Sequence, residues 1–186
     1  MSKKRLFIGI KVEIAKELKN FIIDLKTNLK DEKFKWVDYS NYHLTLKFLG
    51  ETSENLIPQI DNVLKNIAKN NQKFSIQLSG IGVFKNISNP RVLWIGINES
   101  EELNSLFNSI EDKLSLLGFK KEKRDFNPHL TIARIKFLKN KKFLLNKILN
   151  NCDKKWNQSP VNEFILFESI LKREGAVYNE LERYSL

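Results

Sequence analysis

The sequence predicts an α/β (α+β) protein that folds as one bilobal domain over residues 1–186. Runs of apolar residues with strand-like and helix-like spacing alternate along the whole chain. A chain of 186 residues, 41% of them hydrophobic, is long enough to bury one core or two closely packed lobes. Landmarks of the first half also recur in the second. We therefore expect two pseudo-symmetric lobes, each an antiparallel or mixed sheet flanked by helices, with an active-site groove between the sheets.

The recurrence is an internal duplication with approximate halves 1–88 and 89–186. The apolar run at residues 91–97 repeats the pattern of residues 5–10, and Arg91 follows Arg5 by 86 residues. His129 follows His43 by the same 86 residues. Alternation alone is expected in any α/β chain, but a shared offset at two separate landmarks favours duplication.

Each half has the same predicted order of strand, helix, histidine strand, helix and strand. The elements expected in the first half are a strand at 5–10, a helix at 14–29, the histidine strand at 43–50 after a lead-in at 34–37 and 41–42, a helix at 56–67 with Ser53 as N-cap and Pro58 near its start, and a strand at 74–84 kinked at Gly80 or Gly82. The elements expected in the second half are a strand at 91–97, a helix at 103–117 ended by Gly118, a strand entered through Pro128, a short helix at 143–149 and a strand at 161–171. Each half should supply one sheet with its helices outside, so that the two histidine strands face each other.

Both histidines of the chain open the same short phrase. The phrases are His43-Leu44-Thr45-Leu46 and His129-Leu130-Thr131-Ile132, and they hold two of only four threonines. Side chains at i and i+2 of a strand point to the same face. Each phrase therefore places an imidazole beside a hydroxyl. Two buried structural histidines would not need a threonine at this spacing twice over.

Two facing imidazoles suit phosphoester chemistry. Opening a 2′,3′-cyclic phosphate requires a base for the attacking water and an acid for the departing ribose oxygen, on opposite sides of phosphorus. Histidine titrates nearest neutral pH, and the threonine hydroxyls could bind the non-bridging oxygens. The scheme needs no metal or other cofactor, and the chain has neither an H-x-x-x-H nor a C-x-x-C pattern for zinc.

Further candidate residues lie close to these phrases. Lys47 shares strand parity with His43 and Thr45, so it either faces the phosphate or is an ordinary surface lysine. Arg134 has the opposite parity to His129 and would join the site only if a bulge turned it back. The aromatic residues that could stack a nucleobase, although most aromatic residues belong to cores, are Phe48, Phe84, Trp94 and Tyr178.

The chain carries a net charge of +10, which favours a polyanionic partner such as RNA, or else reflects a lysine-rich solvated surface. Cys152 is the only cysteine, so no intramolecular disulfide can form and a reducing compartment is expected. The apolar run at residues 6–10 is too short for a signal peptide, and no run approaches a membrane span. We expect a cytoplasmic monomer with no membrane partner.

The phrases and their flanks resemble the RNA 2′,3′-cyclic phosphodiesterases, also called 2′-5′ RNA ligases, of the two-histidine phosphoesterase superfamily. The segments that carry the resemblance are residues 5–8, Trp36, residues 42–51, 78–84, 91–94 and 126–134, Glu168-Ser169, and the run from Gly175 to Tyr178. Asn127 departs from the pattern, since the family more often has arginine there.

The resemblance implies a bilobal fold with a groove between the lobes. It implies hydrolysis of RNA 2′,3′-cyclic phosphate to a 2′-phosphomonoester, and reversible 2′-5′ joining of tRNA halves. It assigns His43 as proton donor and His129 as proton acceptor, whereas the near-symmetric phrases leave this order open. Thr45 and Thr131 would bind phosphate, with assistance from Arg134. The alternatives are a non-catalytic module that binds RNA ends, and an enzyme for small cyclic phosphates such as ADP-ribose 1″,2″-cyclic phosphate. A longer basic track beyond the site would favour RNA.

Overall fold

The computed structural model describes residues 2–172 and 176–186 of the chain. Gly175, which belongs to the run that resembles the family, lies outside these ranges. The helices and strands are β1 (Lys3–Lys11), α1 (Lys16–Asn28), β2 (Lys33–Trp36), β3 (His43–Ser53), α2 (Ile57–Lys69), β4 (Phe74–Phe84), β5 (Val92–Ile97), α3 (Glu101–Ser115), β6 (His129–Phe137), α4 (Lys141–Leu149), β7 (Lys155–Val161), β8 (Glu163–Leu171) and β9 (Ala176–Ser185). Two short 3-10 turns precede β3 and α2, at Tyr39–Asn41 and Glu54–Leu56.

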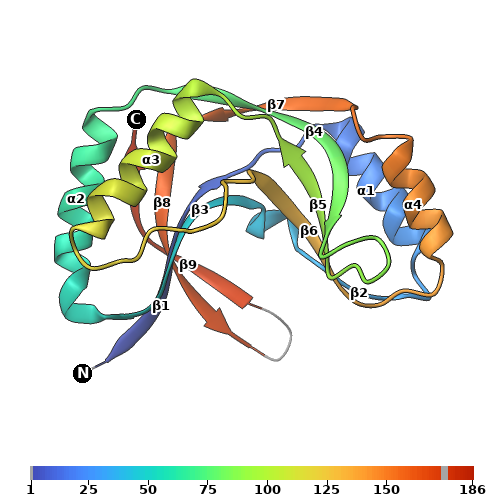
Figure 1. The fold of residues 1–186 in the computed structure, drawn as a ribbon, viewed down its shortest axis with the longest axis horizontal. Coiled ribbons are helices and arrows are strands. Elements are labelled where there is room, and N and C mark those ends of the chain that lie inside the picture. Colours follow the sequence, from blue (N-terminus) through green and yellow to red (C-terminus); the bar gives the residue numbers. More distant parts are fainter. Residues whose placement is uncertain (1, 173–175) are drawn as a thin grey trace.

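The strands form one curled antiparallel sheet rather than two separate ones. Within the described ranges its order is β7-β4-β5-β6-β3-β1-β8-β9, and β2 pairs with the free part of β6. The histidine strands β3 and β6 meet at the centre through a single residue pair, Leu44 and Leu130. Beyond that pair the two strands diverge, which gives the sheet its arched outline and divides it into two lobes (Figure 1).

The two lobes do not correspond to the two halves of the sequence. One lobe contains β1, β3, β8 and β9 with α2 and α3, and the other contains β2 and β4 to β7 with α1 and α4 (Figure 1). The end of β1 and the start of β3 pair at Lys11 and His43, beside the junction of the lobes. The segment between β1 and β3 passes into the other lobe, where it forms α1 and β2, and then leads back to β3. The helix α3, between β5 and β6, crosses in the opposite direction.

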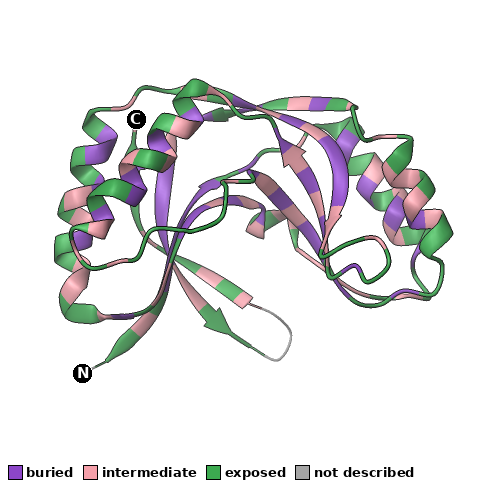
Figure 2. Cartoon of the chain, viewed as in Figure 1, coloured by how far each residue is buried: buried purple, intermediate pink, exposed green. Residues whose placement is uncertain are grey.

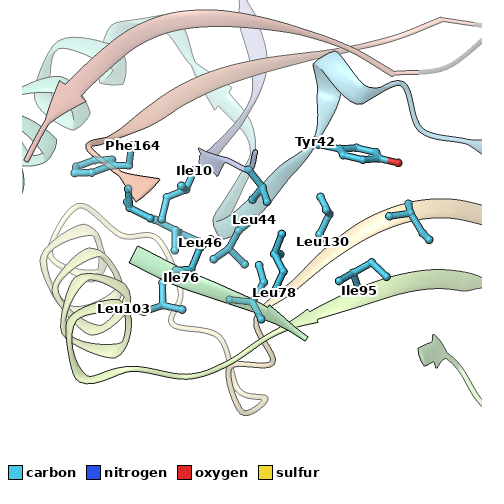
Figure 3. Packing of buried hydrophobic residues seen from close by; sticks show 14 of the residues in the cluster. Ile10, Tyr42, Leu44, Leu46, Ile76, Leu78, Ile95, Leu103, Leu130 and Phe164 are labelled. Atoms are coloured by element: carbon cyan, nitrogen blue, oxygen red, sulfur yellow. The ribbon is translucent and has the colours of Figure 1, made fainter. Parts of the chain in front are cut away.

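The apolar faces of all four helices join one continuous core. Leu18 of α1, Leu64 of α2, Leu106 of α3 and Leu144 of α4 are each fully buried and belong to the same cluster. Figure 2 shows the buried residues on the inner sides of the helices and along the central strands. Complete burial of each such side chain stabilises the fold by about 1.5–3 kcal/mol. The leucines of both histidine phrases lie in this cluster beside Leu78 and Ile95 (Figure 3).

The structure adds three strands that the sequence analysis did not predict, namely β2, β7 and β9. β7 and β9 are the two edges of the sheet. β7 is polar and contains Pro160, and β9 is mostly exposed, so neither has the alternating apolar pattern of an interior strand. Two smaller differences concern α2 and Ser53. Ser53 precedes a 3-10 turn without capping it through its side chain, and α2 begins at Ile57 with Pro58 in its first turn.

Candidate active site

The two histidines open β3 and β6 where these strands diverge, and both line one open cleft of about 780 Å³. Thr45 and Thr131 line the same cleft, as the period of the strands predicts. No residue of the described ranges accepts a hydrogen bond from either hydroxyl, so both are free to bind a ligand. The structure therefore brings together the four side chains that the repeated phrase pointed to.

Both imidazoles are held through the same ring nitrogen. Nδ1 of His43 lies 2.7 Å from the carbonyl oxygen of Asn41, and Nδ1 of His129 lies 2.7 Å from that of Asn127. A carbonyl oxygen only accepts, so Nδ1 carries the proton and donates. Nε2 is then the nitrogen left for proton transfer in each ring. Any residue supplies a carbonyl at position 127, which explains why the family's usual arginine is not needed for this contact.

Aromatic rings fix the orientation of each imidazole. The ring of Tyr178 meets His43 edge-on at 5.0 Å and an interplanar angle of 83°, and Phe7 packs against the same imidazole at 5.0 Å. Phe84 meets His129 edge-on at 4.8 Å and 86°. Edge-to-face packing of this kind restricts ring rotation. Both histidines are thus oriented before a substrate arrives.

Burial lowers the pKa of both imidazoles below their usual value of 6.5. The hydrogen bonds to Asn41 and Asn127 oppose the effect, since donation to a carbonyl favours the charged ring. The pKa of His43 is lowered further by the positive charges of His129 and Arg134. In the unliganded protein both rings therefore favour the neutral form at neutral pH.

A bulge in β6 brings Arg134 into the cleft. Thr131 pairs with Trp94 of β5, but the next pair joins Ala133 to Leu93, so that one residue of β6 is extra. The bulge reverses the alternation of the strand. Arg134 consequently lies on the same side as Thr131 and lines the cleft.

The same bulge occurs at the equivalent place in β3 and has the opposite effect on Lys47. Thr45 pairs with Gly9 of β1 and Lys47 with Ile8, which leaves one extra residue between them. Lys47 is thereby turned under α3, where its Nζ lies 2.7 Å from a carboxylate oxygen of Glu111 and 4% of the residue is exposed. Lys47 lines the cleft, but its Nζ is already bound to Glu111 and to the carbonyl oxygen of Lys120, so its binding of the phosphate stays a prediction.

Phe48 and Arg134 occupy equivalent positions, each two residues after the extra residue of the bulge in its strand. Both line the cleft, and Phe48 is 69% exposed. One wall of the cleft therefore presents a guanidinium group at this position and the other a phenyl ring. This difference breaks the symmetry of the site.

A sequence model described as LigT like Phosphoesterase matches residues 8–94 and again residues 95–178. The chain belongs to the LigT-like phosphoesterase family. It is 37% identical over 180 residues to the RNA 2′,3′-cyclic phosphodiesterase of Methanocaldococcus jannaschii, covering 97% of this chain and 99% of the relative. The protein of that name from Aquifex aeolicus is 34% identical, with 100% and 99% covered. The crystal structure of TT0787 of Thermus thermophilus superposes with a TM-score of 0.80 at 27% identity, covering 98% and 97%.

In this LigT-like phosphoesterase, the indole of Trp94 packs on neighbouring residues of its own sheet. Its indole lies against Gly82, where an added Cβ would come within 2.3 Å of the ring, and packs on Phe84. Its Nε1 is buried without a hydrogen-bond partner in the described chain. Trp94 does not line the cleft, whereas the other aromatic candidates, Phe48, Phe84 and Tyr178, do.

Several cleft residues of this LigT-like phosphoesterase escaped the sequence analysis. They are Arg5 and Phe7 of β1, Phe107 and Glu111 of α3, and residues 120–122 and 124–126 of the loop before β6. The one signal for the loop was its run of charged residues from Lys120 to Arg124 directly before the second motif. Among residues 2–172 and 176–186, no group of three or more His, Cys, Asp and Glu side chains is placed to hold a metal ion. No described helix has the length and apolar character needed to cross a bilayer.

Proposed function

We propose that this protein hydrolyses the 2′,3′-cyclic phosphate at the 3′ end of RNA to a 2′-phosphomonoester. The observation that carries the proposal is the pair of imidazoles in one cleft, each tied at Nδ1 to a carbonyl and each beside a free threonine hydroxyl. The RNA 2′,3′-cyclic phosphodiesterases that match over nearly the whole chain support this choice of substrate.

The proton transfers follow from the free ring nitrogens. His129 takes a proton at Nε2 from a water molecule as its oxygen bonds to phosphorus. The bond from phosphorus to O3′ breaks, and His43 donates its Nε2 proton to the departing oxygen. The product keeps its phosphate on O2′, and exchange with solvent returns both histidines to their starting states. Each positioned acid or base contributes about 10²–10⁴-fold to the rate.

Charge stabilisation comes from the groups around the phosphate. Thr45 and Thr131 donate to the non-bridging oxygens, and Arg134 stabilises the charge that develops there. The bound phosphate also raises the pKa of the adjacent imidazoles, because a negative charge favours their protonated form. The substrate itself thus promotes protonation of His43, which is disfavoured in the empty cleft.

The same geometry supports joining of RNA ends. If a 5′-hydroxyl replaces the attacking water, the two transfers give a 2′-5′ phosphodiester, and the reaction is reversible because one phosphodiester bond is exchanged for another. Halves of a cleaved tRNA would supply both ends. We propose that the protein acts on such ends as a cytoplasmic monomer. A module that only binds RNA ends would not require two oriented imidazoles.

The test is turnover of a short RNA that ends in a 2′,3′-cyclic phosphate, with the product identified by ³¹P NMR. We expect a 2′-phosphate, and a fall in turnover of about 10²–10⁴-fold for His43→Ala and for His129→Ala. The double variant should lose less than the product of the two, since both groups act in one step. Wild-type activity should survive EDTA treatment. Near-normal turnover by either single variant would contradict the mechanism, and recovery only with added metal would contradict metal independence.

A further inference from the structure

The buried Lys47–Glu111 pair holds the loop of residues 116–128, which connects α3 to β6. Nζ of Lys47 donates to Glu111 Oε1 at 2.7 Å and to the carbonyl oxygen of Lys120 at 3.0 Å. The second carboxylate oxygen, Oε2 of Glu111, accepts the backbone N–H of Glu122 at 2.9 Å. The two charged side chains are 3% and 8% exposed. They therefore fix the main chain of the loop at two nearby points, and neither charge faces solvent.

The loop is also fixed at its other end, directly before the active site. Phe126 stacks on Phe107 of α3 at 4.0 Å and 12°. Three residues later the chain enters β6 at His129. In Figure 1 the loop runs from the lower end of α3 across the first lobe to β6. A segment held at both ends presents the side chains between them in a fixed arrangement.

The side chains presented by the loop are mainly cationic. Residues 120–125 are all exposed, and four of the six are Lys or Arg. Glu122 turns one carboxylate oxygen to the backbone N–H groups of Lys123 and Arg124, and Lys121 pairs with Asp112 of α3. Within the described chain, no carboxylate forms an ion pair with Lys120 or Arg124, and both line the cleft.

We propose that this loop binds phosphodiesters of the RNA chain that leads to the cyclic end, and that Lys47 and Glu111 are its positioning residues. The inference rests on the proposed function, which places the cyclic phosphate between the histidines. The chain 5′ to that phosphate must leave the cleft, and its next phosphodiesters carry one negative charge each. Cations that have no acidic partner and line the same cleft suit such a strand. A cyclic mononucleotide has no further phosphodiester for them to bind.

The direct test removes the two unpaired cations with Lys120→Ala/Arg124→Ala. Its matched control is Lys69→Ala/Lys73→Ala, two exposed lysines outside the cleft. The probes are a pentanucleotide with a 2′,3′-cyclic end and 2′,3′-cyclic AMP. For the loop variant, KM for the pentanucleotide should rise roughly tenfold more than KM for cyclic AMP, and the slope of log KM against log salt should fall by about two. In the control variant, the ratio of the two KM values and the slope of log KM against log salt should change only slightly, because the two lost charges lie far from the cleft.

An equal rise in KM for the pentanucleotide and for cyclic AMP would overturn the proposal, because the loop would then affect only the position of His129 and not the binding of the RNA chain. So would an equal rise for ADP-ribose 1″,2″-cyclic phosphate, which has other phosphates but no RNA chain. A fluorescent pentanucleotide with a 2′-phosphate end, titrated by anisotropy, separates this inference from the proposed function. If the pentanucleotide binds more weakly to the loop variant but is not hydrolysed by the wild type, the loop binds RNA and the proposed hydrolase function is wrong. If the wild type hydrolyses the cyclic substrate but binding does not depend on the loop, the hydrolase function stands and the proposal for the loop is wrong.

The positioning role has its own test in Lys47→Met/Glu111→Leu, which replaces the pair with apolar side chains. The cations of residues 120–124 are also trypsin sites, so a released loop should be cut faster than in the wild type. Affinity for the pentanucleotide should fall as trypsin cleavage becomes faster. Lys47→Arg, which keeps the ion pair with Glu111, should have higher affinity and slower cleavage than the apolar double variant. Wild-type RNA affinity with a rapidly cleaved loop would show that the pair does not position the binding surface.

Discussion

At the scale of single residues, His43 and His129 have the same local contacts but different surroundings. Each donates from Nδ1 to a carbonyl two residues earlier and meets an aromatic edge. Only the pKa of His43 is also lowered by neighbouring positive charges, those of His129 and Arg134. The proton on His43 therefore depends more strongly on the negative charge of the substrate. This is consistent with an acid that is charged only when a phosphate is bound.

The donor and acceptor roles can be separated with a substrate whose 3′ bridging oxygen is replaced by sulfur. A thiolate is a much weaker base than an alkoxide and leaves without a proton. We expect the sulfur substrate to restore His43→Ala to within about tenfold of wild type and to leave His129→Ala about 10²–10⁴-fold slower. The measurement is single-turnover hydrolysis of both substrates by both variants. If the sulfur substrate rescues His129→Ala instead, His129 is the proton donor and His43 the proton acceptor.

The pH dependence should distinguish the free enzyme from its complex. The profile of kcat/KM reports the free pair, whose pKa values are lowered by burial, so its optimum should lie on the acid side of neutrality. The kcat profile reports the complex, where the phosphate raises these pKa values. Its alkaline limb should lie at higher pH. Both profiles come from initial rates between about pH 4.5 and 9. Alkaline limbs at the same pH would show that the substrate charge does not set the proton on the acid.

At the scale of elements, the paired bulges decide which residues reach the cleft. The period-2 pattern predicted His43, Thr45 and their counterparts correctly, because they precede the bulges. It does not describe Lys47 and Arg134, which follow the bulges in β3 and β6, so their orientation could not be predicted from the spacing alone. In β6 the extra residue shifts the buried apolar positions from Leu130 and Ile132 to Ala133 and Ile135, whereas in β3 the same shift falls on Lys47, whose polar side chain conceals it. The edge strands β7 and β9 were missed for a related reason, since an exposed edge does not require alternation.

The kink in β4 can be tested against a turn of similar backbone conformation. Gly80 has φ of 61° and Gly50 φ of 70°, both in the left-handed region. An added Cβ at Gly80 would lie 2.4 Å from the carbonyl oxygen of Cys152, whereas nothing lies within 4 Å at Gly50. Gly50→Ala should lower the free energy of unfolding by about 1–2 kcal/mol, the strain of that conformation alone. Gly80→Ala should lower it further in urea titrations. Equal losses would mean that the contact with Cys152 relaxes freely.

At the scale of the whole molecule, the strand and helix order could be predicted but the assignment of elements to lobes could not. Periodicity shows that α1 is amphipathic; it does not show which sheet its apolar face covers. The expectation that each half builds its own lobe placed α1 beside β1, whereas α1 packs near β7 and α3 packs on β3. The crossing connections follow from where the strand ends lie in the assembled sheet, which is tertiary information.

One continuous core should make the two lobes unfold together. All three tryptophans, Trp36, Trp94 and Trp156, lie on β2, β5 and β7, so fluorescence reports one lobe, while far-ultraviolet circular dichroism reports helices in both. The two urea transitions should coincide, because the apolar cluster passes through Leu44 and Leu130 without a break. Transitions with different midpoints would show that each lobe is stable alone.

The crossing of α1 and α3 bears on how such a protein could have arisen. In a chain consisting of one half, the helix would have had to pack on the sheet of a second copy. Such a chain could have buried its sheet only as a symmetric dimer in which each copy gives its helix to the other. The pairing of the histidine strands would then have lain on the two-fold axis, with identical walls on both sides of the cleft. After fusion of two copies into one gene, the residues on the two walls of the cleft can change independently. If the two halves arose by duplication, Phe48 and Arg134 stand at one position of the repeated unit, and their difference is one that only a fused chain permits.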